Sequence, residues 1–174
     1  MGITLTTAVM DDLTSIDDYE SMFRAHYGRL VRALTVVSGS HEAAADAVQS
    51  AFVKAHVRWR RVRHYDDPVA WIRRVAINEL RDEARRNGRK QRAVERLGSM
   101  TPLSTPEPVL DEMGLLLAEL PRQQRLAVSL YYVDQLSVAE IATALKLSEG
   151  AVKFHLHRGR ERLRTVLMGK GTPE

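Results

Sequence analysis

Apolar residues recur at intervals of three and four along almost the whole chain, and nowhere do they alternate with polar residues over the length of a strand. This spacing places apolar side chains on one face of an α-helix. Three helices are predicted in the first half of the chain. Their apolar stripes consist of Tyr19, Phe23, Tyr27, Leu30 and Leu34 in the first, Ala44, Val48, Ala51, Phe52 and Ala55 in the second, and Ile72, Val75, Ala76 and Leu80 in the third. The pattern predicts an all-α fold.

Turn and capping residues mark the ends of these helices. The first helix is expected to end near Gly39, which lies between two serines. Asp67 and Pro68 are expected to start the third, because aspartate caps a helix N-terminus and proline fits the first helical position. Asn87 and Gly88 are expected to stop it.

A helix-turn-helix pattern occupies residues 137–163. Ser137 and Glu140 have the spacing of a capping box, in which each side chain satisfies an otherwise unpaired N–H group at the helix start. Ser148 is expected to cap the second helix, with Glu149 at its positive end. Each helix has one apolar side. These sides consist of Val138, Ile141, Ala142 and Leu145 in the first helix and of Val152, Leu156, Gly159 and Leu163 in the second.

The outward side of the second helix is rich in cations. At about 100° per residue, it holds Gly150, Lys153, Phe154, His157, Arg158 and Glu161. Arg and Lys read guanine in the major groove of DNA, and apolar groups meet the thymine methyl. The alternative is a solvated helix surface. Four arginines between residues 158 and 164 favour DNA binding, because clustered positive charge is typical of a phosphate-binding element.

Between residues 87 and 108 the chain becomes first basic and then rich in Ser, Thr and Pro. Its prolines do not fit a continuous helix, so this segment is predicted to be a flexible linker. Fully extended, it spans roughly 70 Å at about 3.3 Å per residue, on the order of two turns of DNA. The predicted division is an N-terminal tail at 1–15, a first helical unit at 16–87, a linker at 88–108, a second unit at 109–168 and a C-terminal tail at 169–174.

Charge is distributed unevenly in this chain of 174 residues, whose formal net charge is +4. The first 20 residues hold five acidic residues and no Lys or Arg, whereas residues 73–96 are crowded with arginine. Such asymmetry favours an oriented encounter with a polyanion, although arginine also keeps helices soluble.

Cysteine is absent, which excludes disulfides and thiolate metal sites and favours a reducing cytoplasm. No apolar run is long enough to cross a bilayer, and the first ten residues are too polar for a secretory signal. His155 and His157 do not form a metal pair, because residues two apart on a helix face different directions. We therefore expect a cytoplasmic protein with no catalytic residues, cofactor, metal, small-molecule substrate or membrane insertion.

Five short segments, in two separated parts of the chain, carry a family resemblance. In the second unit they are Leu-Ala-Glu-Leu-Pro-Arg-Gln-Gln-Arg at 117–125, Leu-Ser-Val-Ala-Glu-Ile-Ala at 136–142 and Ser-Glu-Gly-Ala-Val-Lys at 148–153. In the first unit they are Asp-Ala-Val-Gln-Ser-Ala-Phe at 46–52 and Trp-Ile-Arg-Arg-Val-Ala-Ile-Asn at 71–78. In this order, they resemble the fourth and second conserved regions of the extracytoplasmic-function (ECF, group 4) sigma factors, of an actinobacterial type.

The resemblance implies roles for three groups of residues. In this family the helix with the Asp-x-x-Gln-x-x-Phe pattern docks on a coiled coil of the largest polymerase subunit, which makes Asp46, Gln49 and Phe52 candidate polymerase contacts. A core position is the alternative for Phe52. The candidates for reading the −10 element are His64, Tyr65, Asp66, Arg74, Asn78, Arg81 and Arg85. The candidates for reading the −35 element are Ser148, Glu149, Gly150, Lys153, Phe154, His157 and Arg158.

The chain departs from the family pattern near two of these sites. Ala45 and Ser50 stand where many relatives have acidic residues, which predicts altered docking on the polymerase. Phe154 and His155 stand where Ser and Arg are common, which predicts an unusual −35 preference. Packing on a neighbouring helix or on a regulator is the alternative for Phe154.

The leading hypothesis is a promoter-specificity subunit whose partners are core RNA polymerase and promoter DNA. The family also implies an anti-sigma protein that holds it inactive. One alternative is a helix-turn-helix repressor or activator whose first unit senses a ligand or dimerises, and another is a DNA-processing enzyme. The segments 46–52 and 63–78 distinguish the first two hypotheses, because a ligand-binding unit has no reason to carry them.

Overall fold

The computed structural model describes residues 3–96 and 112–169, and within them the side chains of residues 16–93 and 114–169. Helices and the short loops between them make up these ranges, and neither range contains a strand. The helices are α1 (Ile3–Ser38), α2 (His41–Val57), α3 (Trp59–Val62), α4 (Pro68–Arg96), α5 (Glu112–Ala118), α6 (Arg122–Tyr132), α7 (Val138–Leu145) and α8 (Glu149–Gly169). The all-α prediction is confirmed.

Helices α1, α2 and α4 form the first unit around a common apolar core. All three predicted stripes contribute to this core, and among the most deeply buried residues are Leu30, Leu34, Val48, Phe52 and Ile72. Residues outside the stripes, such as Ile77, are buried as well, whereas Phe23 of the first stripe is 36% exposed. The turn between α1 and α2 needs a glycine, because Gly39 has a φ of 76°. Ser40 caps α2, accepting from the Ala43 N–H at 3.2 Å, and Asp67 caps α4, accepting from the Ala70 N–H at 2.8 Å.

Two helices are longer than the sequence pattern predicts. Helix α1 begins at Ile3, so residues 3–15, set apart above as a tail, are helical. Helix α4 continues through Asn87 and Gly88 to Arg96, so the predicted stop is wrong and residues 88–96 of the expected linker are helical. A glycine inside a helix costs only about 1 kcal/mol relative to alanine, and the Arg, Lys and Gln residues around Gly88 are good helix formers.

The helix-turn-helix of the second unit has the expected caps. The Ser137 side chain and the Glu140 carboxylate form both halves of the capping box at the start of α7. Ser148 accepts from the Ala151 N–H at 3.1 Å at the start of α8. Helices α6 and α8 cross at Gly159, where an added Cβ would lie 2.7 Å from Cγ2 of Val128. The glycine therefore allows the two helices to approach closely.

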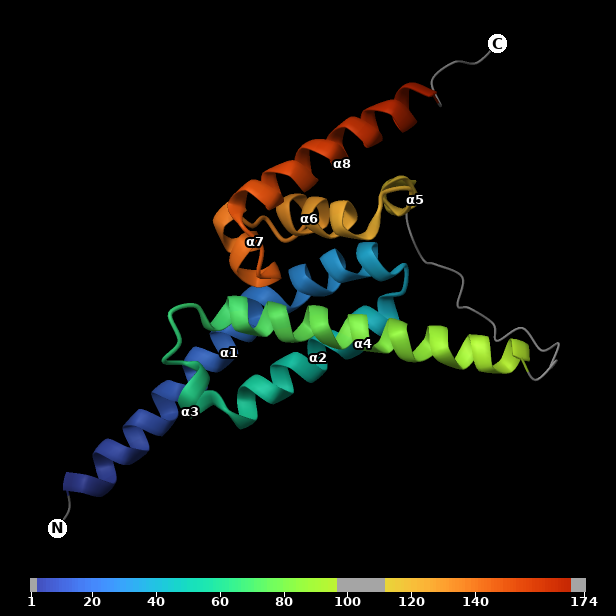
Figure 1. The fold of residues 1–174 in the computed structure, drawn as a ribbon. Coiled ribbons are helices and arrows are strands. Elements are labelled where there is room, and N and C mark those ends of the chain that lie inside the picture. Colours follow the sequence, from blue (N-terminus) through green and yellow to red (C-terminus); the bar gives the residue numbers. More distant parts are fainter. Residues whose placement is uncertain (1–2, 97–111, 170–174) are drawn as a thin grey trace.

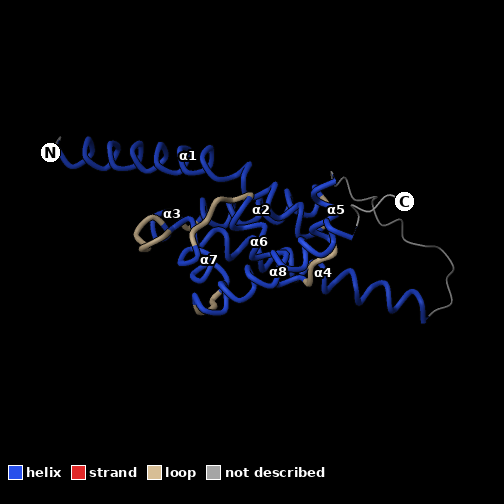
Figure 2. Tube along the Cα trace, turned by 90° about the horizontal axis from the view of Figure 1, so that it is seen from above, coloured by secondary structure: helices blue, strands red, loops and turns tan. Residues whose placement is uncertain are grey.

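The two units pack against each other, with α6 on α1 and α7 on α4 (Figures 1 and 2). Arg73 Nε lies 2.7 Å from Asp134 Oδ2 across this boundary, and the two side chains are 6% and 0% exposed. The Ser129 hydroxyl donates to the Ala33 carbonyl at 2.7 Å. The N-terminal part of α1 and the C-terminal part of α4 project from the packed body in both views.

Candidate nucleic-acid and polymerase interfaces

Helix α8 presents the predicted cationic face to solvent. Val152, Leu156 and Gly159 are buried on its inner side, whereas Lys153 and Phe154 are exposed on the other, and Phe154 keeps 58% of its surface accessible. The remaining −35 candidates, which are Ser148, Glu149, Gly150, His157 and Arg158, lie at the start of the helix or on the same outward side. The structure therefore gathers this group on one accessible helix face.

Among the described side chains, the polar groups on this face pair with one another within the helix. Lys153 Nζ lies 3.6 Å from a Glu149 carboxylate oxygen, and Arg158 and His157 lie 3.3 and 3.5 Å from Glu161 oxygens. All five side chains are about half exposed or more, and surface pairs of this kind are worth about 0–1 kcal/mol. The cations can therefore exchange these partners for phosphates or bases at little cost.

The −10 candidates lie on α4 and on the loop before it. Arg74, Asn78, Arg81 and Arg85 are spaced four, three and four apart, which places them along one side of α4. Asn78 and Arg85 are exposed, and Arg74 and Arg81 are half-buried. Burial lowers the pKa of Arg81, and the neighbouring Arg122 and Arg85 guanidinium groups lower it further. This side of α4 is therefore a cationic surface.

Residues 63–67 form the loop between α3 and α4. His64 and Asp66 are exposed, whereas Tyr65 is half-buried with its ring 6.2 Å from the Trp71 ring. The Arg63 Nε–H group donates to His64 Nε2 at 3.3 Å. The loop thus presents polar side chains beside two aromatic rings, an arrangement that suits an unstacked base.

On α2 the structure separates the three polymerase candidates. Asp46 and Gln49 are exposed, but Phe52 is only 2% exposed and packs against Phe23, with the ring centroids 5.0 Å apart. Phe52 is therefore a core residue in this structure. The sequence reasoning missed Val53, which is 55% exposed and follows Gln49 by four residues on the same side of the helix. The signal was its spacing of four from Gln49.

Two arginines of α4 bind partners in the second unit when the units are packed. The sequence assigned no role to Arg73 and predicted that Arg74 binds DNA. Arg73 is buried against Asp134, and Arg74 donates to the Thr143 carbonyl of α7 at 2.7 Å. Burial lowers the pKa of His26 beside this pair, and Arg73 and Arg29 lower it further. The boundary between the units thus contains a buried charged pair, and α7 covers the start of the side of α4 that holds the −10 candidates.

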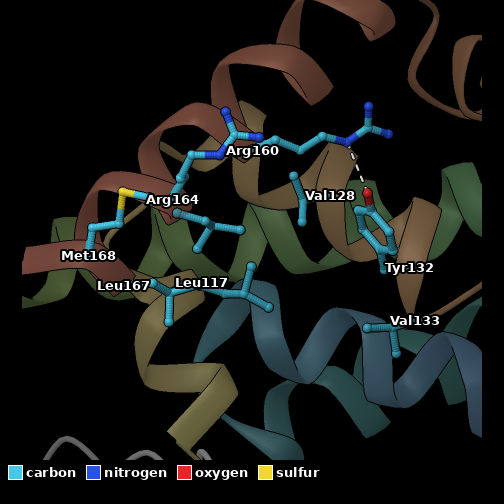
Figure 3. A pocket seen from close by; sticks show the side chains of 9 residues that line it. Leu117, Val128, Tyr132, Val133, Arg160, Arg164, Leu167 and Met168 are labelled. Atoms are coloured by element: carbon cyan, nitrogen blue, oxygen red, sulfur yellow. Dashed lines mark hydrogen bonds between the residues drawn. The ribbon is translucent and has the colours of Figure 1, made fainter. Parts of the chain in front are cut away.

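An apolar groove of about 670 Å³ lies between α5, α6 and the C-terminal part of α8 (Figure 3). Sequence reasoning did not predict it. Arg160 at its edge donates from Nε to the Tyr132 hydroxyl at 2.9 Å. The apolar lining residues are Leu117, Val128, Val133, Leu163, Leu167 and Met168. Among the described side chains no cluster of His, Asp or Glu could hold a metal ion, and none of the described helices combines the length and hydrophobicity needed to cross a membrane.

Both units match families of known proteins. The model for Sigma-70 region 2 matches residues 22–90, and the model for Sigma-70 region 4 matches residues 110–163. The chain is 31% identical over 159 residues to the ECF RNA polymerase sigma factor SigM of Mycobacterium tuberculosis, covering 86% of this chain and 76% of that protein. It is 29% identical over 155 residues to the RNA polymerase sigma-E factor of Streptomyces coelicolor, covering 88% of each.

Two solved structures have a similar fold. One is the sigma factor RpoE in complex with the anti-sigma factor NepR from Bartonella quintana, with a TM-score of 0.69, 23% identity and coverage of 87% of this chain and 97% of that one. The other is CnrH in complex with the cytosolic domain of CnrY, with a TM-score of 0.62, 24% identity and coverage of 87% and 88%. Each likeness extends over most of both chains.

Proposed function

The chain belongs to the ECF sigma factors of the sigma-70 family, and on that premise we propose how its two units share the reading of a promoter. It is an alternative sigma factor, which binds core RNA polymerase, recognises the −35 and −10 elements and promotes transcription initiation. A match to Sigma-70 region 2 over residues 22–90 leaves no place for the ligand-sensing unit of a repressor.

The outward face of α8 is proposed to read the −35 element in the major groove. One observation supports this proposal above all: α8 is a capped helix whose inner side is buried and whose cationic outer side is accessible. Arg158 and Lys153 would bind guanine or phosphate, and the exposed Phe154 ring would touch a thymine methyl.

The side of α4 that holds Arg74, Asn78, Arg81 and Arg85 is proposed to bind the −10 element together with residues 64–66 of the preceding loop. The loop supplies polar groups for an extruded base, and the arginines supply charge for the strand backbone. Because Arg74 is bound to the Thr143 carbonyl in the packed arrangement, its use on DNA requires α7 to leave α4.

Asp46 and Gln49 are proposed to contact the polymerase from the exposed side of α2, with Val53 beside them. Phe52 contributes by packing the helix rather than by touching a partner, since it is buried. We further propose an anti-sigma protein as regulator and the cytoplasm as the place of action. The support is that the two structures described above are complexes, one of them with an anti-sigma factor.

Run-off transcription with purified core RNA polymerase and a library of promoter fragments tests this function. Start sites that appear only with the protein are expected, and their upstream sequences give both elements. Asp46→Ala combined with Gln49→Ala should abolish these transcripts, whereas the exposed Ser21→Ala on α1 should leave them unchanged. Duplex binding without polymerase association or new transcripts would contradict the proposal, and failure to co-purify a partner from resting cells would contradict the anti-sigma part.

A further inference from the structure

The cationic side of α4 does not end with the −10 candidates. Because the helix continues to Arg96, the spacing of four and three that joins Arg74 to Arg85 is repeated by Arg89 and Arg92. At about 100° per residue, Arg89 and Arg92 lie on the same side of the helix as Arg85. A continuous row of guanidinium groups therefore runs from the packed body onto the projecting part of α4.

This projecting part is exposed and carries excess positive charge. From residue 85 to residue 92 the sequence holds five cations and no acidic residue. Arg89 and Arg92 are exposed, and Arg92 donates to the Gly88 carbonyl of its own helix at 2.9 Å. Arg89 has no acidic partner among the described side chains. We call residues 85–92 the basic arm.

The basic arm is costly for the free protein. A helix gains most of its stability from packing an apolar face, and most of the arm is solvent-exposed. Arg85 lies 3.6 Å from an Asp82 oxygen, but Arg89 adds a like charge four residues further along the same side of the helix, and like charges at this spacing destabilise a helix. A polyanion lying along the row would relieve this repulsion, which is a reason to expect one as the partner.

The direction of the helix indicates which polyanion it meets. If α4 binds the −10 element, its C-terminal end leads the chain toward the second unit, whose target, the −35 element, lies upstream. The distance from Asn78 to Arg92 is about 21 Å at 1.5 Å per residue, which corresponds to about six base pairs at 3.4 Å each. The arm therefore extends over the duplex between the two elements.

We propose that Arg89 and Arg92 bind phosphates of the spacer duplex between the −10 and −35 elements. This inference rests on the proposed function and adds to it a third DNA contact that neither reading unit makes. Guanidinium groups bind phosphate oxygens in bidentate fashion. Such contacts position a protein on DNA without reading sequence, so the arm fixes the register of the two units.

The test compares charge removal on two sides of the arm in the full-length holoenzyme. Arg89→Gln with Arg92→Gln removes the last two charges of the row, and glutamine has a helix propensity similar to that of arginine. Arg86→Gln with Lys90→Gln is the matched control, because it removes the same charge roughly 90–130° around the helix. The promoter fragment is one found by wild-type run-off transcription. The Kd of each holoenzyme for this fragment is measured over a range of salt concentrations.

The Arg89 and Arg92 variant should weaken promoter binding and reduce the slope of log K against log salt by about 1.8, since each lost phosphate contact removes about 0.9. The control variant should keep the wild-type slope. On a fragment whose spacer phosphates are replaced by neutral methylphosphonates, the wild type should bind as weakly as the variant. Arg89→Lys with Arg92→Lys should restore most of the slope, because it restores the charge.

Three results would overturn the proposal. Equal slopes for the wild type and the Arg89 and Arg92 variant would show that the row does not contact DNA. An equal loss in the control would show a non-specific effect of net charge, and a loss that persists on the neutral spacer would assign the row to another partner, such as RNA or an acidic protein. Each of these leaves wild-type run-off transcription intact, whereas its absence would overturn the proposed function itself.

Discussion

Replacement of Asp134 by asparagine tests whether the buried ion pair holds the two units together. In the native arrangement the Arg73 guanidinium is 6% exposed and its partner carboxylate is fully buried. The substitution keeps the shape of the side chain but removes its charge. Arg73 is then left as a buried cation without an opposite charge within hydrogen-bond distance.

Removing one partner of a buried pair costs about 3–5 kcal/mol. In this protein the cost has a specific outlet, because separation of the units would return Arg73 to water, and this separation works against the apolar side chains that α1 and α6 bury in one common cluster. The equilibrium between packed and separated units should therefore shift by about a hundredfold to several thousandfold, at about 1.4 kcal/mol per factor of ten. Helix content should change little.

Fluorescence energy transfer between the units measures this shift. The chain has no cysteine, so Glu42→Cys on α2 and Thr165→Cys on α8, both at exposed positions, accept a donor and an acceptor dye selectively. We expect high transfer in the wild-type background and a clear loss with Asp134→Asn. Circular dichroism at 222 nm should report unchanged helix content in both.

The apolar replacement of both partners is the matched control. Arg73→Met with Asp134→Leu removes the pair without leaving a buried charge, a change that is often neutral or stabilising. This variant should stay packed. Unchanged transfer in Asp134→Asn would refute the reasoning that the ion pair holds the units together, and equal separation in the apolar control would show that shape rather than charge is responsible.

Three further predictions concern the second unit. Gly159→Ala should lower the free energy of unfolding by about 1–3 kcal/mol, and with it the melting temperature, because the new Cβ would lie 2.7 Å from a side chain of α6. An unchanged melting curve would contradict the close crossing of α6 and α8. The Ser137 hydrogen bonds lower the pKa of Glu140, so their stabilisation is present above about pH 4.3, the unfolded value, and is lost as pH falls through the folded pKa. Ser137→Ala should therefore flatten the acid side of a stability–pH profile, and an identical profile would contradict this origin of the shift. Lys153→Ala should weaken binding to the −35 element without changing stability, whereas Arg24→Ala, the same charge loss at an exposed position of α1, should not, and equal losses in both would argue against a specific role for Lys153.

Local signals in the sequence were sufficient for the helices and caps. The capping box at Ser137, the cap at Ser148 and the inner and outer sides of α8 depend on residues three or four apart, and the structure has all of them. Gly88 shows the limit of such signals. Its cost to a helix is small, and the propensity of its neighbours outweighs it, so α4 continues where a stop was predicted.

Other features depend on contacts between residues far apart in the chain. Arg73 and Asp134 are separated by 61 positions, and no periodicity in the sequence brings them together. The burial of Phe52 likewise depends on Phe23 of another helix, so the family pattern alone did not separate a core residue from a partner contact. The site residues themselves and their roles remain predictions that the experiments above address.

The position of α7 over α4 makes the protein's valence for DNA depend on its conformation. In the packed arrangement the cationic face of α8 is free, while Arg74 is held by the Thr143 carbonyl. With the roles proposed above, a packed chain engages DNA through one reading unit and exchanges rapidly between sites. A separated chain engages through both, and the tether then raises the effective concentration of the second unit to the millimolar range. Avidity, rather than the affinity of either unit, would then distinguish a promoter from an isolated −35-like sequence.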